Sequence, residues 1–109
     1  MDTNTELEQA ASALESLGNP TRLSVFRALV RAGPHGLSVG ELQSRLEIPG
    51  STLSHHVAHL VRNDLLSRTR EGRVLRCRAN YASMDALMDY LTRECCQESG
   101  DSGSCDTSC

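Results

Sequence analysis

The sequence predicts a mainly α-helical fold with one small β-hairpin, and three observations indicate it. Apolar residues recur at helical spacing in five separate segments. Two of these segments are neighbours separated only by the tight break EIPG, and an arginine-rich stretch with two β-capable runs follows them. The 109-residue length predicts one domain, over residues 1–96, followed by a flexible cysteine-containing tail over residues 97–109.

The first helix is predicted over residues 5–17, TELEQAASALESL. Thr5 and Glu8 have the spacing of a capping box, in which each side chain accepts a hydrogen bond from the other residue's backbone N–H. One apolar stripe of this helix consists of Leu7, Ala10, Ala11 and Leu14.

The second helix is predicted to begin at the pair Asn19 and Pro20. Asparagine is a favoured N-cap residue, and proline is favoured in the first turn because it has no N–H to leave unpaired. Gly33 should end the helix. Its expected buried side consists of Leu23, Phe26, Leu29 and Val30.

The third and fourth helices are predicted to form a helix-turn-helix. The third should begin at Ser38, with Glu41 at capping distance and with Leu42 and Leu46 on its apolar face. The fourth should run over about residues 50–63. The EIPG break leaves only a tight turn between them, as this motif requires.

A hairpin and a fifth helix complete the prediction. Residues 66–70 and 73–79 are β-capable and flank the turn pair Glu71-Gly72. A hairpin directly after a helix-turn-helix predicts a winged helix-turn-helix with a two-stranded wing. The fifth helix should begin at Ser83, and its apolar stripe consists of Met84, Leu87, Met88 and Leu91.

Charge is segregated along the chain. The net charge is only −3, yet residues 20–80 contain ten arginines and four acids, a net of +6. The flanking residues 1–19 and 81–109 carry −4 and −5. A basic centre indicates a polyanionic partner, although an ordinary solvated face has the same composition. Together with the helix-turn-helix, the charge favours double-stranded DNA.

The fourth helix has an outward face suited to the major groove. At 100° per residue, its apolar stripe faces the core, and the opposite face carries hydroxyl, imidazole and guanidinium groups that can reach base edges. The DNA-contacting residues expected on or beside this face are Ser51, Thr52, His55, His59 and Arg62. His55 and His59 also have the i, i+4 spacing of a helical metal pair, but without an accompanying Glu or Cys a DNA-facing role is favoured. On the wing, Arg68, Arg70, Arg73 and Arg76 suit phosphate or minor-groove contact.

The five cysteines, an odd number, do not suggest a disulfide framework. The start MDTNTELEQ lacks the basic and apolar regions of a signal peptide, and no apolar run is long enough to span a membrane. We therefore expect a cytoplasmic protein, in which thiols stay reduced and serve metal binding or redox sensing.

Two stretches carry a family resemblance. LGNPTRLSVFRAL and LSVGELQSRLEIPGSTLSHHVAHLVRNDLLSRTREGRVLRCRANY resemble the ArsR/SmtB family of winged-helix repressors over about residues 7–96, most specifically in STLSHHVAHL. The resemblance implies a homodimer formed through the first and fifth helices. It implies that the dimer binds operator DNA without ligand and releases it when a metal or metalloid binds. By the family motif, it implies DNA contacts at Ser51, Thr52, Ser54 and His55.

Two ligand sites that are common in this family are missing. Many arsenic-sensing members have a pattern like ELCVCDL in the third helix, where this chain has ELQSRL. Zinc-sensing members use Asp, His and Glu along the fifth helix, where this chain has Asp85 and Asp89 but no His. Any sensing site must therefore lie elsewhere.

The predicted inducer site consists of Cys95, Cys96 and Cys105, and the predicted inducer is trivalent arsenic or antimony, As(III) or Sb(III), which takes three sulfur ligands. Some arsenic-sensing relatives similarly place their thiols at the end of the last helix. Adjacent helical residues point about 100° apart, so Cys95 and Cys96 can share one ion only where the last turn is irregular. Cys105 closes a shorter loop than Cys109, which favours it by only about 0.3 kcal/mol.

Other readings of the cysteines remain open. Cys95 continues the stripe of the fifth helix, so it can also be a plain core residue, and Cys77 in the second wing strand is expected to be structural. Methylated trivalent arsenic would need only two thiols. A redox or persulfide sensor would use a cysteine pair, and a zinc, cadmium or lead site would add Cys109. Catalysis is not expected, because no cysteine begins a C-x5-R phosphate loop and no Gly-rich phosphate loop is present.

Overall fold

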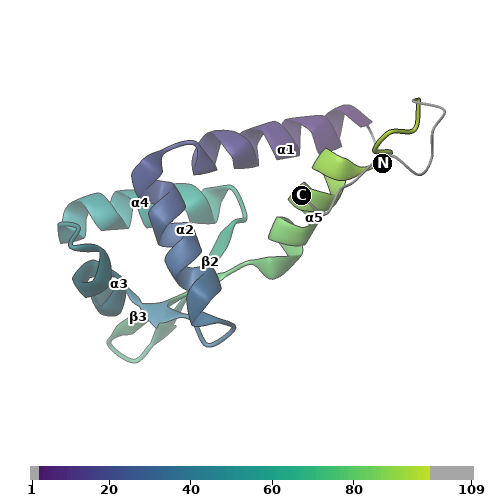
Figure 1. Ribbon diagram of the computed structural model, residues 1–109. Coiled ribbons are helices and arrows are strands. Elements are labelled where there is room, and N and C mark those ends of the chain that lie inside the picture. Colours follow the sequence, from purple (N-terminus) through teal and green to yellow (C-terminus); the bar gives the residue numbers. More distant parts are fainter. Residues whose placement is uncertain (1–2, 99–109) are drawn as a thin grey trace.

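The computed structural model describes residues 3–98, which form five helices and a three-stranded sheet (Figure 1). The fold class predicted from the sequence, a winged helix-turn-helix, is confirmed. The elements in chain order are α1 (Thr3–Leu17), α2 (Pro20–Ala32), β1 (Leu37–Ser38), α3 (Val39–Leu46), α4 (Gly50–Arg62), β2 (Leu66–Glu71), β3 (Val74–Ala79) and α5 (Tyr81–Thr92). None of these helices is long and apolar enough to cross a membrane.

The wing has one strand more than predicted. β2 and β3 form the expected antiparallel hairpin, in which Glu71 pairs with Val74. The turn therefore consists of Gly72 and Arg73, one residue later than expected, and Gly72 has a positive φ of 65°. β1 adds to the other edge of β3, so the strand order is β1-β3-β2. A two-residue strand has no periodicity, which explains why the sequence did not reveal it.

The capping residues fix the ends of α2 and the start of α3. Asn19 Oδ1 accepts hydrogen bonds from the backbone N–H groups of Thr21 at 2.9 Å and Arg22 at 3.1 Å. The N–H of Gly33 donates to carbonyl groups of the last turn of α2. Ser38 and its N3 residue form the reciprocal capping box, with hydrogen bonds of 3.0 and 2.9 Å. The three predicted caps are confirmed.

Two predicted helix starts are wrong. α1 begins at Thr3, so Thr5 and Glu8 lie inside the helix and form no cap. α5 begins at Tyr81, and its N-cap is Asn80, whose Oδ1 accepts from the Ser83 N–H at 3.2 Å. In both cases the helix extends beyond the polar residue that was expected to start it.

The core lies between the sheet and helices α2, α3 and α4. Its fully buried side chains include Val25, Leu29, Leu42, Leu53 and Leu60. The buried side expected for α2 is correct at Phe26 and Leu29 and wrong at Leu23, which is 42% exposed. Val25 takes the buried position instead.

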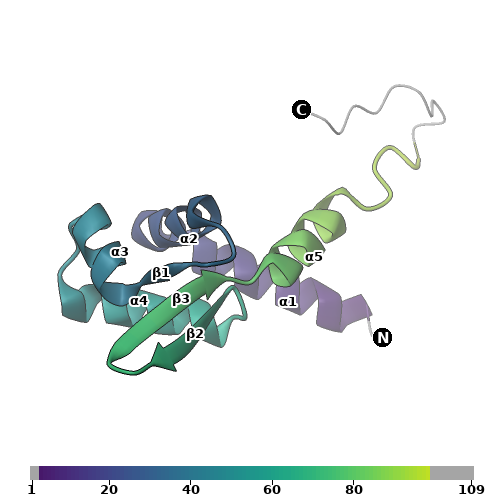
Figure 2. The ribbon, with the colours of Figure 1, turned by 90° about the horizontal axis from the view of Figure 1, so that it is seen from below.

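α1 and α5 leave apolar side chains in solvent. The expected stripe of α1 is split, because Ala10 is buried while Leu7 and Leu14 are 52% and 45% exposed. α5 buries no residue fully, and its Met88 and Leu91 are 61% and 55% exposed. Figures 1 and 2 show α5 at the end of the molecule far from α3. α1 and α5 therefore both carry large apolar side chains that the described chain does not cover.

Candidate nucleic-acid interface and thiol segment

The turn between α3 and α4 fixes the orientation of α4, the second helix of the helix-turn-helix and the one expected to read DNA. α3 ends at Glu47, which has a left-handed φ of 54° and donates its N–H to Gln43 O at 2.9 Å. Pro49 then precedes α4 as its N-cap, and its carbonyl accepts from the Leu53 N–H at 2.9 Å. The core-facing stripe of α4, Leu53, Val57 and Leu60, is at most 1% exposed, as expected. The opposite face of α4 is therefore turned outward.

The outward face of α4 is polar and exposed. The exposed side chains on it are Ser51, Thr52, Ser54, His55 and Arg62. The His55 ring packs edge-on against the His56 ring, with centroids 5.8 Å apart. Small hydroxyls and an imidazole on an exposed helix can donate to and accept from base edges in a major groove. The exposure of Ser51, Thr52, His55 and Arg62 agrees with the arrangement predicted from the helical wheel, and Ser54, which only the family resemblance named, is exposed beside them.

His59 lies elsewhere than expected. Its Nδ1 is 2.9 Å from the hydroxyl of Ser16 on α1, and its Nε2 is 3.9 Å from Glu15 Oε1. Asn63 Nδ2 donates to the His59 carbonyl at 2.9 Å, and the His59 side chain is 20% exposed. The outward position expected for His59 is therefore corrected: it joins α4 to α1, a contact across 43 residues that a helical wheel cannot reveal.

His56 is partly buried beside α2. Its Nδ1 has no hydrogen-bond partner within the described residues. Desolvation lowers its pKa, and the positive charge of Arg22 lowers it further. Both effects disfavour the charged form of the His56 imidazole.

The arginines of the wing fall into two groups, those paired with Glu71 and those exposed to solvent. Glu71 Oε1 accepts from Arg76 Nε at 2.9 Å, and Glu71 Oε2 accepts from Arg78 Nη2 at 3.1 Å. These hydrogen bonds lower the pKa of Glu71. Because Arg76 and Arg78 are both held by this carboxylate, they differ from the three remaining wing arginines. Those three, Arg68, Arg70 and Arg73, are exposed.

Cys77 on β3 is fully buried in the core, and burial raises the pKa of its thiol. It pairs with Leu37 of β1 on one side and with Arg68 of β2 on the other. This position agrees with the structural role expected from the sequence.

The chain leaves the helix before the paired cysteines. α5 ends at Thr92, and Glu94 and Cys96 both have left-handed φ, 64° and 61°. Cys95 therefore does not continue the apolar stripe of α5, and both cysteines are exposed. Their Sγ atoms lie 3.6 Å apart, so the irregular last turn that a shared ligand requires is present.

The predicted third ligand, Cys105, lies outside the described residues, as does Cys109. Within residues 3–98, no group of three or more His, Cys, Asp or Glu side chains is arranged to hold a metal ion.

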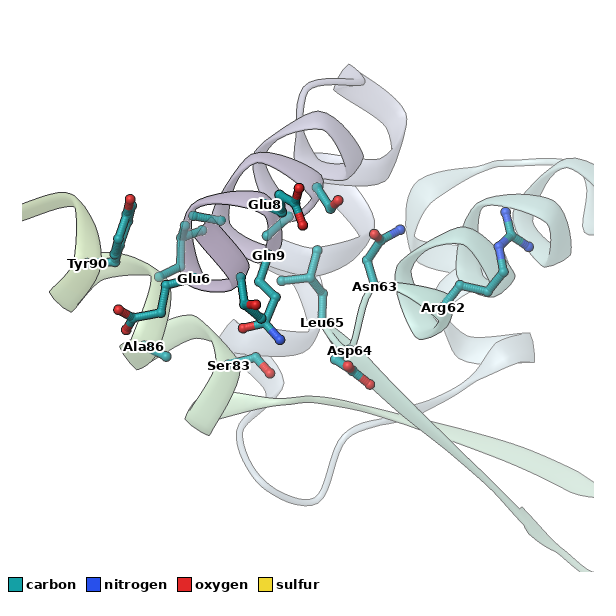
Figure 3. Close-up of a pocket in the computed structure, with 15 residues that line it drawn as sticks. Glu6, Glu8, Gln9, Arg62, Asn63, Asp64, Leu65, Ser83, Ala86 and Tyr90 are labelled. Carbon is teal, nitrogen blue, oxygen red and sulfur yellow. The ribbon is translucent and has the colours of Figure 1, made fainter. Parts of the chain in front are cut away.

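A cavity of about 430 Å³ separates α1, the end of α4 and α5 (Figure 3). Glu6 and Gln9 of α1, Asn63 and Asp64 after α4, and Tyr90 of α5 are among the polar residues that line it. None of the cysteines in the described part of the chain, Cys77, Cys95 and Cys96, lines this cavity.

Comparisons with known proteins agree with this geometry. Residues 17–69 match the family described as "Helix-turn-helix domain". The transcriptional activator HlyU of Vibrio cholerae is 34% identical over 89 residues, which span 82% of this chain and 80% of HlyU. An ArsR-like transcriptional regulator from Rhodococcus sp. RHA1 superposes with a TM-score of 0.74, covering 86% of each chain. The chain belongs to the ArsR/SmtB family of winged-helix transcriptional regulators.

Two further structures define how far this ArsR/SmtB likeness extends. The structure of HlyU is 33% identical and covers 89% of this chain and 100% of HlyU, with a TM-score of 0.67. The winged helix-turn-helix domain of Mb0332 from Mycobacterium bovis, described as homodimeric, is 23% identical, with a TM-score of 0.64 over 81% of this chain and 82% of that one. The Rhodococcus and Mycobacterium structures are each 23% identical to this chain, and at that identity they show the fold alone.

The ArsR/SmtB membership settles the class of function. The relatives are transcriptional regulators, so this chain is a DNA-binding transcriptional regulator and not an enzyme.

Proposed function

We propose that this regulator is a repressor that binds operator DNA as a homodimer and is released by trivalent arsenic or antimony bound to Cys95, Cys96 and Cys105. The observation that carries the proposal is the 3.6 Å separation of the Cys95 and Cys96 Sγ atoms at the end of α5. A zinc ion about 2.3 Å from each of two thiolates, for comparison, holds their sulfurs about 3.8 Å apart in tetrahedral geometry. The two sulfurs are therefore spaced for one soft ion.

The binding step is a ligand exchange. Each thiol gives up its proton as its sulfur bonds to arsenic, and each new bond replaces one hydroxide of arsenite. The proton and hydroxide leave as water, so three thiols release three waters and no oxidant is needed. Methylated trivalent arsenic has one position closed by carbon and takes two thiols.

The dimer is proposed to form through α1 and α5. The two helices contact each other, and both expose large apolar side chains: Leu7 and Leu14 from α1, and Met88 and Leu91 from α5. Exposed apolar side chains that gather into a patch mark an interaction site, and a dimer through α1 and α5 would remove these four from water. The related Mb0332 domain is described as homodimeric, which supports the same assembly here.

On DNA, each protomer would place α4 in the major groove. Ser51, Thr52, Ser54 and His55 lie on the exposed face and are the proposed base-edge contacts. Proposed phosphate or minor-groove contacts are Arg62, Arg68, Arg70 and Arg73. Two recognition helices must fit half-sites about 34–36 Å apart, so a small rearrangement of the dimer can release the DNA.

The proposal is tested by a DNA-release titration of the reduced full-length chain. The operator is first selected from random duplexes, and arsenite, antimonite, methylarsenite, zinc, cadmium and hydrogen peroxide are then compared. Release by arsenite or antimonite is expected, and Cys95→Ser or Cys96→Ser should abolish it. Cys77→Ala is the matched control, because Cys77 is buried and distant in sequence, and it should respond like wild type. A response to peroxide alone contradicts the metalloid proposal, and a response to zinc or cadmium alone favours a four-thiol site.

The third ligand is tested by shortening the tail. A chain ending after Gln97 should bind DNA normally, respond poorly to arsenite and still respond to methylarsenite. Full arsenite sensitivity in this truncated chain would show that Cys105 is not a ligand. Because HlyU is named an activator, a promoter-reporter assay with and without the regulator separately tests whether this chain represses.

The second candidate is a redox or persulfide sensor that uses the same cysteine pair. A solved structure of the relative HlyU is described as reduced HlyU, which favours thiol chemistry in that protein. Peroxide would oxidise two thiols to a disulfide and would itself be reduced to two waters. Release by peroxide or polysulfide, reversed by a dithiol reductant and without a response to arsenite, is the outcome that selects this candidate.

A further inference from the structure

We infer that α1 transmits the state of the segment containing Cys95 and Cys96 to α4, the helix proposed to enter the DNA groove. Ser16 is the residue that positions α4, through its contact with His59. The inference deepens the proposed function and rests on it for the nature of the signal. It depends on two polar contacts, one near each end of α1, that connect elements far apart in the sequence.

The first contact joins α5 to the N-terminal part of α1. Arg93 Nη1 donates to Glu6 Oε1 at 3.2 Å and to Glu6 Oε2 at 3.1 Å. Arg93 Nη2 donates to Asp89 Oδ2 at 3.0 Å, and the guanidinium lies 5.5 Å from the centre of the Tyr90 ring. Arg93 is the first residue after α5 and precedes Cys95 by two positions. A backbone change at the cysteines therefore acts on this guanidinium directly.

The second contact joins the C-terminal part of α1 to α4. The Ser16 side chain is fully buried, and its Oγ lies 2.9 Å from His59 Nδ1. The Ser16 carbonyl accepts from Arg22 Nε at 2.7 Å, which ties the same turn to α2. Asn63 Nδ2 donates to the His59 carbonyl at 2.9 Å. A buried hydroxyl held in this way fixes the last turns of α4 relative to α1.

α1 is suited to connect these two contacts. Glu6 and Ser16 are ten residues apart on one uninterrupted helix, which is about 15 Å at the helical rise. Between them, the small side chains of Ala10 and Ala13 pack against the rest of the molecule. The cavity in Figure 3 lies between α1 and α5, so the end of α5 can shift without first expelling packed side chains. Such a shift would be passed to α1 through Glu6 and to α4 through Ser16.

The test uses Glu6→Gln and Ser16→Ala in the full-length chain. Glu8→Gln and Ser12→Ala are the matched controls, because Glu8 and Ser12 also line the cavity from α1. The coupling ratio is the operator Kd with saturating arsenite divided by the Kd without it. A wild-type ratio of about 5 to 150 is typical of such coupling. It should fall toward 1 in both test variants and stay unchanged in the controls, while direct arsenite binding, followed by the near-ultraviolet absorbance of arsenic–thiolate bonds, stays as in wild type.

A second readout requires no ligand. The inference predicts that Glu6→Gln shifts the imidazole NMR signals of His59, which lies on α4 and contacts α1 at Ser16, ten residues after Glu6, and that Glu8→Gln leaves them in place. Wild-type coupling and unshifted His59 signals in Glu6→Gln would overturn the inference. If wild type binds no arsenite, the proposed function fails, and the His59 signals alone then decide whether α1 links the two ends.

Discussion

Glu71 at the end of β2 accepts a hydrogen bond from Arg76 Nε on β3 at 2.9 Å. The second carboxylate oxygen accepts one from Arg78 at 3.1 Å. Opposite charges so placed reduce the positive field of the wing, even though both partners are partly exposed. The wing therefore presents less free charge to a phosphate backbone than its five arginines suggest.

Removing this carboxylate should strengthen DNA binding. In Glu71→Gln, Arg76 and Arg78 lose their ionic partner and become available to phosphates. The operator Kd should decrease, and each added phosphate contact should steepen the log–log salt slope by about 0.9. Fluorescence anisotropy at several salt concentrations measures both quantities. Glu8→Gln on α1 removes the same charge far from the wing and should leave the slope unchanged; an equal effect in both variants would contradict the prediction.

Acid should destabilise the fold partly through two carboxylates. The backbone hydrogen bond from Ser38 holds the pKa of Glu41 below its ordinary 4.5, and the Arg76 and Arg78 hydrogen bonds do the same for Glu71. A depressed folded-state pKa contributes stability that is fully present above the unfolded value and is lost as pH falls through the folded value. The free energy of unfolding should therefore fall with pH below about 4.5 in wild type. The decline should be smaller in the Glu41→Gln/Glu71→Gln double variant, as urea denaturation at each pH can determine.

The outward face of α4 should determine operator affinity. Ser51→Ala and His55→Ala each remove one proposed base contact from an exposed position. Each should weaken operator binding by about 1–3 kcal/mol, or roughly 5- to 150-fold, with little effect on nonspecific DNA. Sedimentation should show an unchanged dimer. Ser44→Ala, an exposed serine on α3, is the control. Wild-type affinity in both α4 variants would mean that another face reads the operator.

Gly36 should tolerate no side chain. Its φ is +72°, and a Cβ built there would lie 2.1 Å from the Cys77 carbonyl oxygen. Gly36→Ala should therefore separate β1 from β3 and cost several kcal/mol of stability, as backbone strain and a steric clash combine. Gly72→Ala is the matched control, because Gly72 has a similar φ of +65° but open space around it. It should cost only about 1–2 kcal/mol. Equal losses in thermal denaturation would show that backbone conformation alone matters.

The exposed apolar residues of α1 and α5 should hold the dimer together. Leu14→Glu or Leu91→Glu places a charge in the proposed interface and should yield monomers that keep the helical circular dichroism of wild type. Operator affinity should fall strongly, because each monomer then contacts a single half-site. Leu23→Glu on α2 is the control, since Leu23 is also 42% exposed yet lies outside the proposed interface. A dimeric Leu91→Glu protein, seen by light scattering, would place the interface elsewhere.

The sequence predicted the helix ends correctly wherever the capping residue bonds backbone groups within its own helical turn. Asn19, Gly33 and Ser38 end or begin helices as predicted, because each bonds backbone groups at most four residues away. The exposed residues of α4 were placed correctly because its apolar stripe is unambiguous.

Contacts between distant segments were not readable. The apolar stripe of α2 could not show whether a given side chain faces the protein's own core or the outside, and Leu23 was misjudged for that reason. His59 was assigned outward because its partner, Ser16, lies 43 residues earlier. β1 was missed because its two residues are strand only through pairing with β3.

The end of α5 at Thr92 also has an evolutionary consequence. Residues 94–98 are all exposed, so replacing or inserting residues there disturbs no buried side chain and costs the domain little stability. Mutations can therefore introduce new sulfur, nitrogen or oxygen ligand atoms in this segment while α4 and the wing continue to bind the same operator. During evolution, a regulator with this fold can therefore change the chemical signal to which it responds while it continues to control the same genes.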